Sequence, residues 1–135
     1  MTIRILRLGV ARQSDEGLRI GTVRRPPRGV SKDEYASKNI FDLWFPNLAP
    51  SALLLKNAFP VHDEKSWRAF KRKFLAEMKR PEARRDLDLL ASFSHQTNFS
   101  VGCYCADEAR CHRSILRDLL EMRGANIETI NQAAD

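Results

Sequence analysis

The residue types best suited to chemistry are concentrated in one short segment, residues 101–113. This segment holds all three cysteines of the chain and one of its three histidines, followed directly by an arginine. A thiolate is a nucleophile and a metal ligand, an imidazole transfers protons near neutral pH, and a guanidinium binds anions. The composition of the segment therefore predicts a functional site.

The position of this segment supports the same prediction. Residues 98–101 have the pattern of a strand, and residues 114–122 have the pattern of a helix. In α/β proteins, ligands usually bind at such strand-to-helix turns, outside the carboxyl end of the sheet. We expect Cys111 to open the helix, where free backbone N–H groups and the helix dipole favour a thiolate or a bound anion.

These features suggest roles for individual residues. Cys111 is predicted to be the nucleophile, because neighbouring cationic groups and a helix start lower the pKa of a thiol. His112 is the expected proton carrier, although a surface histidine would give the same pattern. Cys103 is a further catalytic candidate, or a small core residue. The role of Cys105 is less defined.

Three arginines are candidate anion ligands. Arg24 follows a predicted strand and Arg28 lies in a Pro-Arg-Gly turn, so both would lie at the carboxyl edge of a parallel sheet near Arg113. Guanidinium groups match phosphate and carboxylate oxygens well. A structural role in ion pairs would explain the presence of Arg24 and Arg28 as well as anion binding would.

The spacing Cys-x-Cys-x5-Cys-His also allows other chemistry. Three thiolates and one imidazole are a zinc-binding set, but the segment has no C-x2-C pair and Cys111 and His112 are adjacent. We therefore assign no metal ligand, and the pattern identifies neither a cofactor nor an oligomeric state.

Gly102-Cys103, followed by Cys111-His112-Arg113-Ser114, resembles the strand cysteine and Cys-His-Arg signature of domain-of-unknown-function family 488, DUF488. The likeness to the shorter, YeaO-like branch of that family runs from about residue 3 to about residue 124. Its further matching segments, in order, are 13–17, 18–23, Arg24, 27–29, Trp44, 50–51 and 55–59. Residues 23–29 depart from the Asp-Arg-Leu-Trp-Pro-Arg-Gly usual in that branch. The resemblance implies a compact α/β domain and carries over Cys103, Cys111, His112 and Arg113, but implies no established activity.

The charge of the chain indicates the kind of partner to expect. Its 23 Lys and Arg exceed its 17 Asp and Glu, which gives a net charge of +6 and a pI near 9.6. An anionic small molecule or nucleotide is therefore the expected partner, and nucleic acid stays open. A solvated helix face would explain many of the same cations equally well. Those with helical spacing are Lys65, Arg68, Lys71, Arg72, Lys73, Lys79 and Arg80.

Composition also indicates the compartment. No apolar run approaches the roughly 18 residues that a membrane span requires, and the first residues do not form a signal peptide. We expect a cytoplasmic protein without membrane contact. Three cysteines, an odd number, in such a chain favour reduced thiols over disulfides.

The elements that must position these residues follow from the apolar pattern. Residues 2–8 and 18–23 are rich in β-branched and apolar residues, which predicts two strands. Ser31 and Glu34 have capping-box spacing, which predicts a short helix to about residue 38. Further expected elements are helices at 50–57, after the N-cap Asp63, after Pro81 and at 111–123, and strands at 98–104 and 126–130.

Strands that alternate with helices predict an α/β fold, a single compact domain whose mixed, mostly parallel sheet is flanked by helices. We expect the domain to span residues 1–130 and residues 131–135 to be a flexible tail. The pattern favours a cysteine-dependent hydrolase or transferase acting on a phosphorylated or nucleotide-like anion. A nucleic-acid-binding module, or a metal- or redox-sensing module without catalysis, is the alternative.

Overall fold

The computed structural model describes residues 1–128, which form one four-stranded sheet. The strands are β1 (Ile3–Arg7), β2 (Leu18–Gly21), β3 (Leu43–Trp44) and β4 (Phe99–Cys103), in the order β1-β4-β2-β3. All three strand pairs are parallel, so the carboxyl ends of the four strands meet at one edge. The α/β fold class is thus confirmed, with β4 between β1 and β2.

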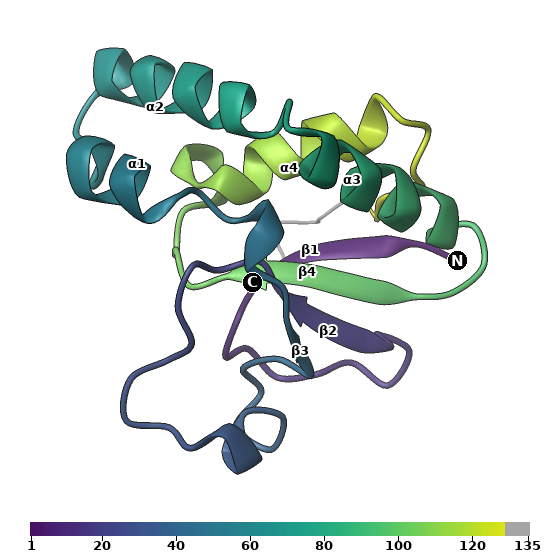
Figure 1. The fold of residues 1–135 in the computed structure, drawn as a ribbon. Helices are drawn as coiled ribbons and strands as arrows, with labels where there is room; N and C mark the ends of the chain where they lie inside the picture. The colour runs from purple at the N-terminus through teal and green to yellow at the C-terminus, as the bar shows by residue number, and fades with distance from the viewer. Residues whose placement is uncertain (129–135) are drawn as a thin grey trace.

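Four helices cover one side of this sheet, as Figure 1 shows. They are α1 (Ala52–Ala58), α2 (Glu64–Glu77), α3 (Pro81–Phe93) and α4 (His112–Glu121). Three 3-10 turns, η1 (Lys32–Glu34), η2 (Pro46–Leu48) and η3 (Glu108–Arg110), lie in the connections. The segment between β2 and β3 extends away from the helices.

The main core lies between the sheet and the helices, because alternate strand residues point to that side. Ile3 and Ile5 of β1 and Phe99 and Val101 of β4 are buried there. The helices contribute apolar side chains at three- and four-residue steps, as an amphipathic helix requires. They include Phe70, Phe74, Leu87, Leu90, Ile115, Leu116 and Leu120.

A polar cluster is buried on the opposite face of the sheet. Arg19 and Ser100 alternate with core-facing residues, and both contact the Glu16 carboxylate. The Arg19 guanidinium donates hydrogen bonds of 2.6 and 3.1 Å to Glu16, and the Ser100 hydroxyl donates one of 3.0 Å. A buried charge is stable only when it is paired in this way.

Most predicted elements are present, but residues 31–38 do not form the expected helix. They contain the 3-10 turn η1 followed by further hydrogen-bonded turns. The Ser31 hydroxyl donates to the Glu34 carboxylate at 2.9 Å and makes no cap with the backbone. The two residues with capping-box spacing thus contact each other through their side chains and do not cap the backbone.

Near the C-terminus, Ile127 forms only an isolated parallel bridge with Ile3 rather than part of a strand. Residues 129–135, which include the expected tail, lie outside the described part. Among residues 1–128, no helix is both long and apolar enough to cross a membrane.

Candidate functional site

The cysteine segment connects the carboxyl end of β4 to α4 through η3. Asp107 caps η3 by accepting a hydrogen bond of 3.0 Å from the backbone N–H of Ala109. Glu108 forms an ion pair of 2.7 Å with Arg117 of α4. These contacts attach the turn to the helix that follows it.

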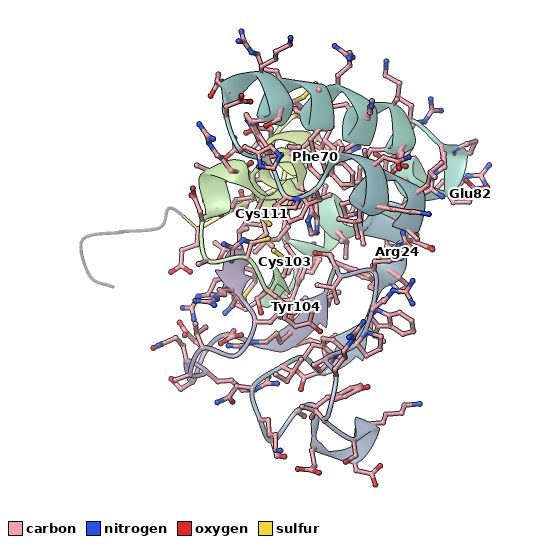
Figure 2. The ribbon with its side chains drawn as sticks, turned by 90° about the vertical axis from the view of Figure 1, so that its left-hand side faces the viewer. Arg24, Phe70, Glu82, Cys103, Tyr104 and Cys111 are labelled. Carbon is pink, nitrogen blue, oxygen red and sulfur yellow. The ribbon has the colours of Figure 1, made fainter. Side chains whose placement is uncertain are left out.

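Cys111 is the N-cap of α4 and has extended backbone angles. Its side chain is fully buried and lies 2.6 Å, between sulfur atoms, from Cys103. Figure 2 shows these two side chains next to each other, where the sheet meets the helices. Cys105 is half-buried and packs against the same pair, so the fold brings all three free thiols together.

His112, the first residue of α4, lies with its ring buried against this thiol pair. Its Nε2 is 2.6 Å from the carbonyl oxygen of Thr22, so Nε2 carries the proton and donates. Nδ1 then has the free lone pair and lies 3.7 Å from Cys111 Sγ. Burial lowers the pKa of His112 to about 4, against the opposing hydrogen bond to Thr22, so the ring is neutral at pH 7.

The three thiols influence one another's ionisation. Hydrogen bonds with Cys103 and then Cys111 lower the pKa of Cys105 to about 3. The pKa of Cys103 is raised, first by its hydrogen bonds with Cys105 and Cys111 and then by burial. For Cys111, the hydrogen bond with Cys103 lowers the pKa, but Cys105 and burial outweigh it and raise the value to about 12. These shifts favour ionisation at Cys105, the most exposed of the three thiols, over ionisation at Cys103 or Cys111.

A cleft of about 290 Å³ opens beside this cluster. Its lining combines thiols and two arginines with an apolar wall, and contains no carboxylate among the described residues. The lining residues are Val23, Arg24, Arg25, Pro50, Ala52, Leu55, Phe59, Cys103, Tyr104, Cys105 and His112. Cys111 lies behind this surface rather than on it.

The three predicted anion ligands have different positions. Arg24 lines the cleft, but its guanidinium donates to the carbonyl oxygens of Pro46, Ala49 and Pro50 at 2.9 to 3.1 Å. Its pKa is lowered, chiefly by burial.

Arg113 is buried, and its Nη2 donates to the carbonyl oxygen of Cys105 at 2.8 Å. Its Nε has no hydrogen-bond partner in residues 1–128. Arg28 is exposed and is absent from the cleft lining.

Sequence reasoning missed Arg25 and Tyr104, which both line the cleft. Tyr104 donates a hydrogen bond of 3.3 Å to the carbonyl oxygen of Arg25, and burial raises its pKa to about 12. In the sequence, Arg25 follows Arg24, and Tyr104 lies between two cysteines. This adjacency was the only sequence signal that they belong to the cleft. The carbonyl of Thr22, which fixes the His112 tautomer, has no sequence signal at all.

The same geometry determines whether the cluster can hold a metal ion. The ligand atoms of Cys103, Cys111 and His112 lie within 4.8 Å of one another. The 3.7 Å from Cys111 Sγ to His112 Nδ1 suits one tetrahedral zinc ion, for which about 3.6 Å is expected from ordinary bond lengths. Two thiolates on one zinc need about 3.8 Å between their sulfur atoms. The observed 2.6 Å is too short, so the donor types fit zinc but their spacing does not.

The parallel sheet, the helices on one side and the thiol cluster at the carboxyl edge define a class: an α/β domain with its site at a strand-to-helix turn. A family model described as the active DUF488-N3 subclade, DUF488-N3a, matches residues 3–124. The chain therefore belongs to the DUF488 family, as its cysteine and Cys-His-Arg segments predicted. No curated protein and no solved structure has a significant match to it.

Proposed function

We propose that this protein is a cysteine-dependent hydrolase or transferase that acts on a small organic anion bound in the cleft. One observation carries the proposal. The half-buried Cys105 thiol lines a cleft that also contains two arginines and, among the described residues, no carboxylate. A nucleophile and a positively charged binding surface thus share one cavity.

The cleft lining indicates the substrate class. Arg25 is exposed, and its guanidinium has no hydrogen-bond partner among the described residues, so it is available to an anionic group. Leu55 and Phe59, which also line the cleft, offer apolar contact. A carboxylate or phosphate ester with an apolar body satisfies both surfaces.

Exposure favours Cys105 over Cys111 as the nucleophile. A substrate can reach a thiol that lines the cleft, whereas Cys111 is fully buried behind it. We assign Cys111 and Cys103 to a supporting role, because both lie against Cys105 and their hydrogen bonding lowers its pKa. His112 holds this pair in place through its bond to Thr22.

The proposed reaction has two steps. The Cys105 sulfur forms a bond to the electrophilic centre, and the bond to the leaving group breaks as that group departs with its electron pair and takes a proton from water. Water, or the hydroxyl of an acceptor, then attacks the same centre, loses a proton and restores the thiolate. The balance is hydrolysis in the first case and group transfer in the second.

Paired alkylating agents test the site without a known substrate. Iodoacetate carries the anionic group that the cleft should bind, and iodoacetamide is its neutral counterpart. The ratio of their rates at Cys105, measured by peptide mass spectrometry, should fall about tenfold in Arg25→Gln, because a charge-assisted contact is worth about 1.4 kcal/mol or more. Arg28→Gln removes an equal charge from the same loop outside the cleft and should leave the ratio unchanged.

Turnover is tested with 4-nitrophenyl esters of acidic and of neutral acyl groups. The acidic ester should be preferred, and Cys105→Ser should reduce kcat/KM by about 10³-fold or more with the fold intact. Full activity in Cys105→Ser would refute the nucleophile. If the protein binds one zinc ion per chain and Cys105 does not react, the enzymatic proposal is wrong and the protein is a metal-binding module.

A further inference from the structure

A second charged surface lies on α2, apart from the cleft. Six basic residues on this helix and the turn after it form a surface that we call the basic face. Its members are Lys65, Arg68, Lys71, Arg72, Lys73 and Lys79. Five of the six are exposed, and Lys71 is half-buried. Four of them surround Leu75 and Ala76 in a shallow groove along the helix.

The charges of the basic face are not neutralised by neighbouring carboxylates. None of the six forms an ion pair or a side-chain hydrogen bond within the described residues. Elsewhere arginines commonly pair with carboxylates. Those pairs involve Arg4, Arg12, Arg19, Arg110, Arg117 and Arg123. The basic face therefore brings together six cations without a paired carboxylate on α2 and the turn after it.

This concentration has a cost for the isolated helix. Arg68 lies three residues from Lys65 and from Lys71, and four residues from Arg72, so three like-charged pairs share one side of α2. Each such pair destabilises a helix by about 0.2–0.5 kcal/mol. A bound polyanion would offset this repulsion.

The opposite side of α2 fixes the basic face in space. Trp67, Phe70 and Phe74 are buried in the main core, where their rings stack on one another. In Figure 2, nitrogen-tipped side chains extend outward from the helix that carries Phe70, away from the sheet. Four of the cations thus line one groove on a rigid support.

The chemistry of this surface selects among polyanions. Membrane binding by a helix requires an available apolar face, and that of α2 is buried. A protein interface normally has an apolar or aromatic centre, and the basic face has no exposed large apolar residue. We propose that the basic face binds the phosphate backbone of a nucleic acid, which needs only a row of cations.

Fluorescence anisotropy with a labelled oligothymidylate long enough to span α2 tests the proposal. The wild-type protein should bind it with an affinity that falls steeply between about 50 and about 200 mM salt. In Arg68→Gln/Arg72→Gln/Lys79→Gln, the slope of log K against log salt should decrease by about 2, and binding at low salt should weaken at least about tenfold.

The matched control is Arg28→Gln/Lys32→Gln/Lys38→Gln, which removes the same net charge from the segment between β2 and β3. It should keep most of the affinity, and circular dichroism should show both variants folded. An equal loss of affinity in the two variants would show that only the net charge of the protein matters, and it would overturn the proposal. Absent or salt-insensitive binding would also overturn it. Equal affinity for polyglutamate would also overturn it, in favour of an acidic protein. The α2 variant should label normally at Cys105, which separates this result from the enzymatic proposal.

Discussion

Cys103 and Cys111 are closed off from solvent, whereas Cys105, two residues beyond β4, is half-buried. The difference follows from backbone position. Cys103 ends a central strand and Cys111 caps a packed helix, but Cys105 lies in the open turn between them. Three chemically identical groups therefore differ in access to reagents.

This difference predicts ordered labelling. In the native protein, iodoacetamide should modify Cys105 first and leave Cys103 and Cys111 largely unmodified. All three should react in urea, because unfolding removes the burial that protects two of them. Timed quenching and peptide mass spectrometry measure the order. Labelling of native Cys111 as fast as Cys105 would contradict the described packing.

At this scale the sequence predicted which candidate residues meet at the turn but not the position of each of them. Cys103, His112 and Arg24 line the cleft at the predicted turn. The burial of Cys111 depends on extended N-cap angles, which place its sulfur against Cys103. Arg25 lines the cleft and Arg28 does not. This difference depends on the path of the chain through two prolines, which a local pattern does not specify.

Among the elements, α2 is the one that local sequence signals define most completely. The Asp63 carboxylate accepts a hydrogen bond of 2.7 Å from the Ser66 backbone N–H, and the Ser66 hydroxyl accepts one of 3.0 Å from the Asp63 N–H. Asp63→Ala should therefore lower the free energy of unfolding by about 1 kcal/mol. Urea denaturation measures the change. Glu121→Ala, at the exposed end of α4, should change stability by less than about 0.5 kcal/mol.

The turn before β2 depends on a glycine. Gly17 has φ of 77°, and a Cβ at this position would collide with the backbone carbonyl of Asn98. Gly17→Ala should destabilise the protein by about 3 kcal/mol or more, from the strained angle plus the collision. Gly29 has φ of 74° with open space around it, so Gly29→Ala should cost only about 1 kcal/mol. Equal melting temperatures for the two variants would exclude the collision.

The prediction of elements succeeded where local signals agree. The cap at Asp63 and the apolar spacing of Phe70 and Phe74 both specified α2, and α2 is present. At residues 31–38 the capping spacing had no apolar periodicity to support it. A cap without a buried face gives a helix little packing energy, so only η1 forms there.

The stability of the whole molecule should depend on pH through the buried Glu16. Burial alone would raise its pKa, but hydrogen bonds from Arg19, the Gln13 backbone and Ser100 outweigh it and lower the pKa. A lowered folded-state pKa stabilises the protein above the unfolded value of about 4.3, and this contribution is lost as pH falls below it. The melting temperature should therefore drop between about pH 5 and pH 3.

Glu16→Gln provides the control. It should remove much of that pH dependence and destabilise the protein at pH 7 by about 3 kcal/mol or more, because it leaves Arg19 buried without a counter-charge. Calorimetry across the pH range measures both effects. An unchanged acid transition in this variant would assign the dependence to other carboxylates, such as Asp42, whose pKa is also lowered.

For the molecule as a whole, the sequence indicated an α/β domain and not its strand order. The apolar runs of β1, β2 and β4 identify strands but do not state their neighbours. The placement of β4 between β1 and β2 depends on contacts across most of the chain, such as the pairing of Phe99 with both Ile3 and Leu18. Local patterns do not encode such contacts.

That strand order also governs how the molecule assembles in time. Neither β1 nor β2 has a partner for its inner edge until β4, almost a hundred residues after β1, has been synthesised. Pairings of such long separation form slowly, because the loops between them must close first. On the ribosome, we therefore expect the inner edges of these two strands to keep their backbone N–H and C=O groups unpaired until β4 emerges. The four-stranded sheet can be completed only after β4, which ends at the first of the three thiols, has emerged.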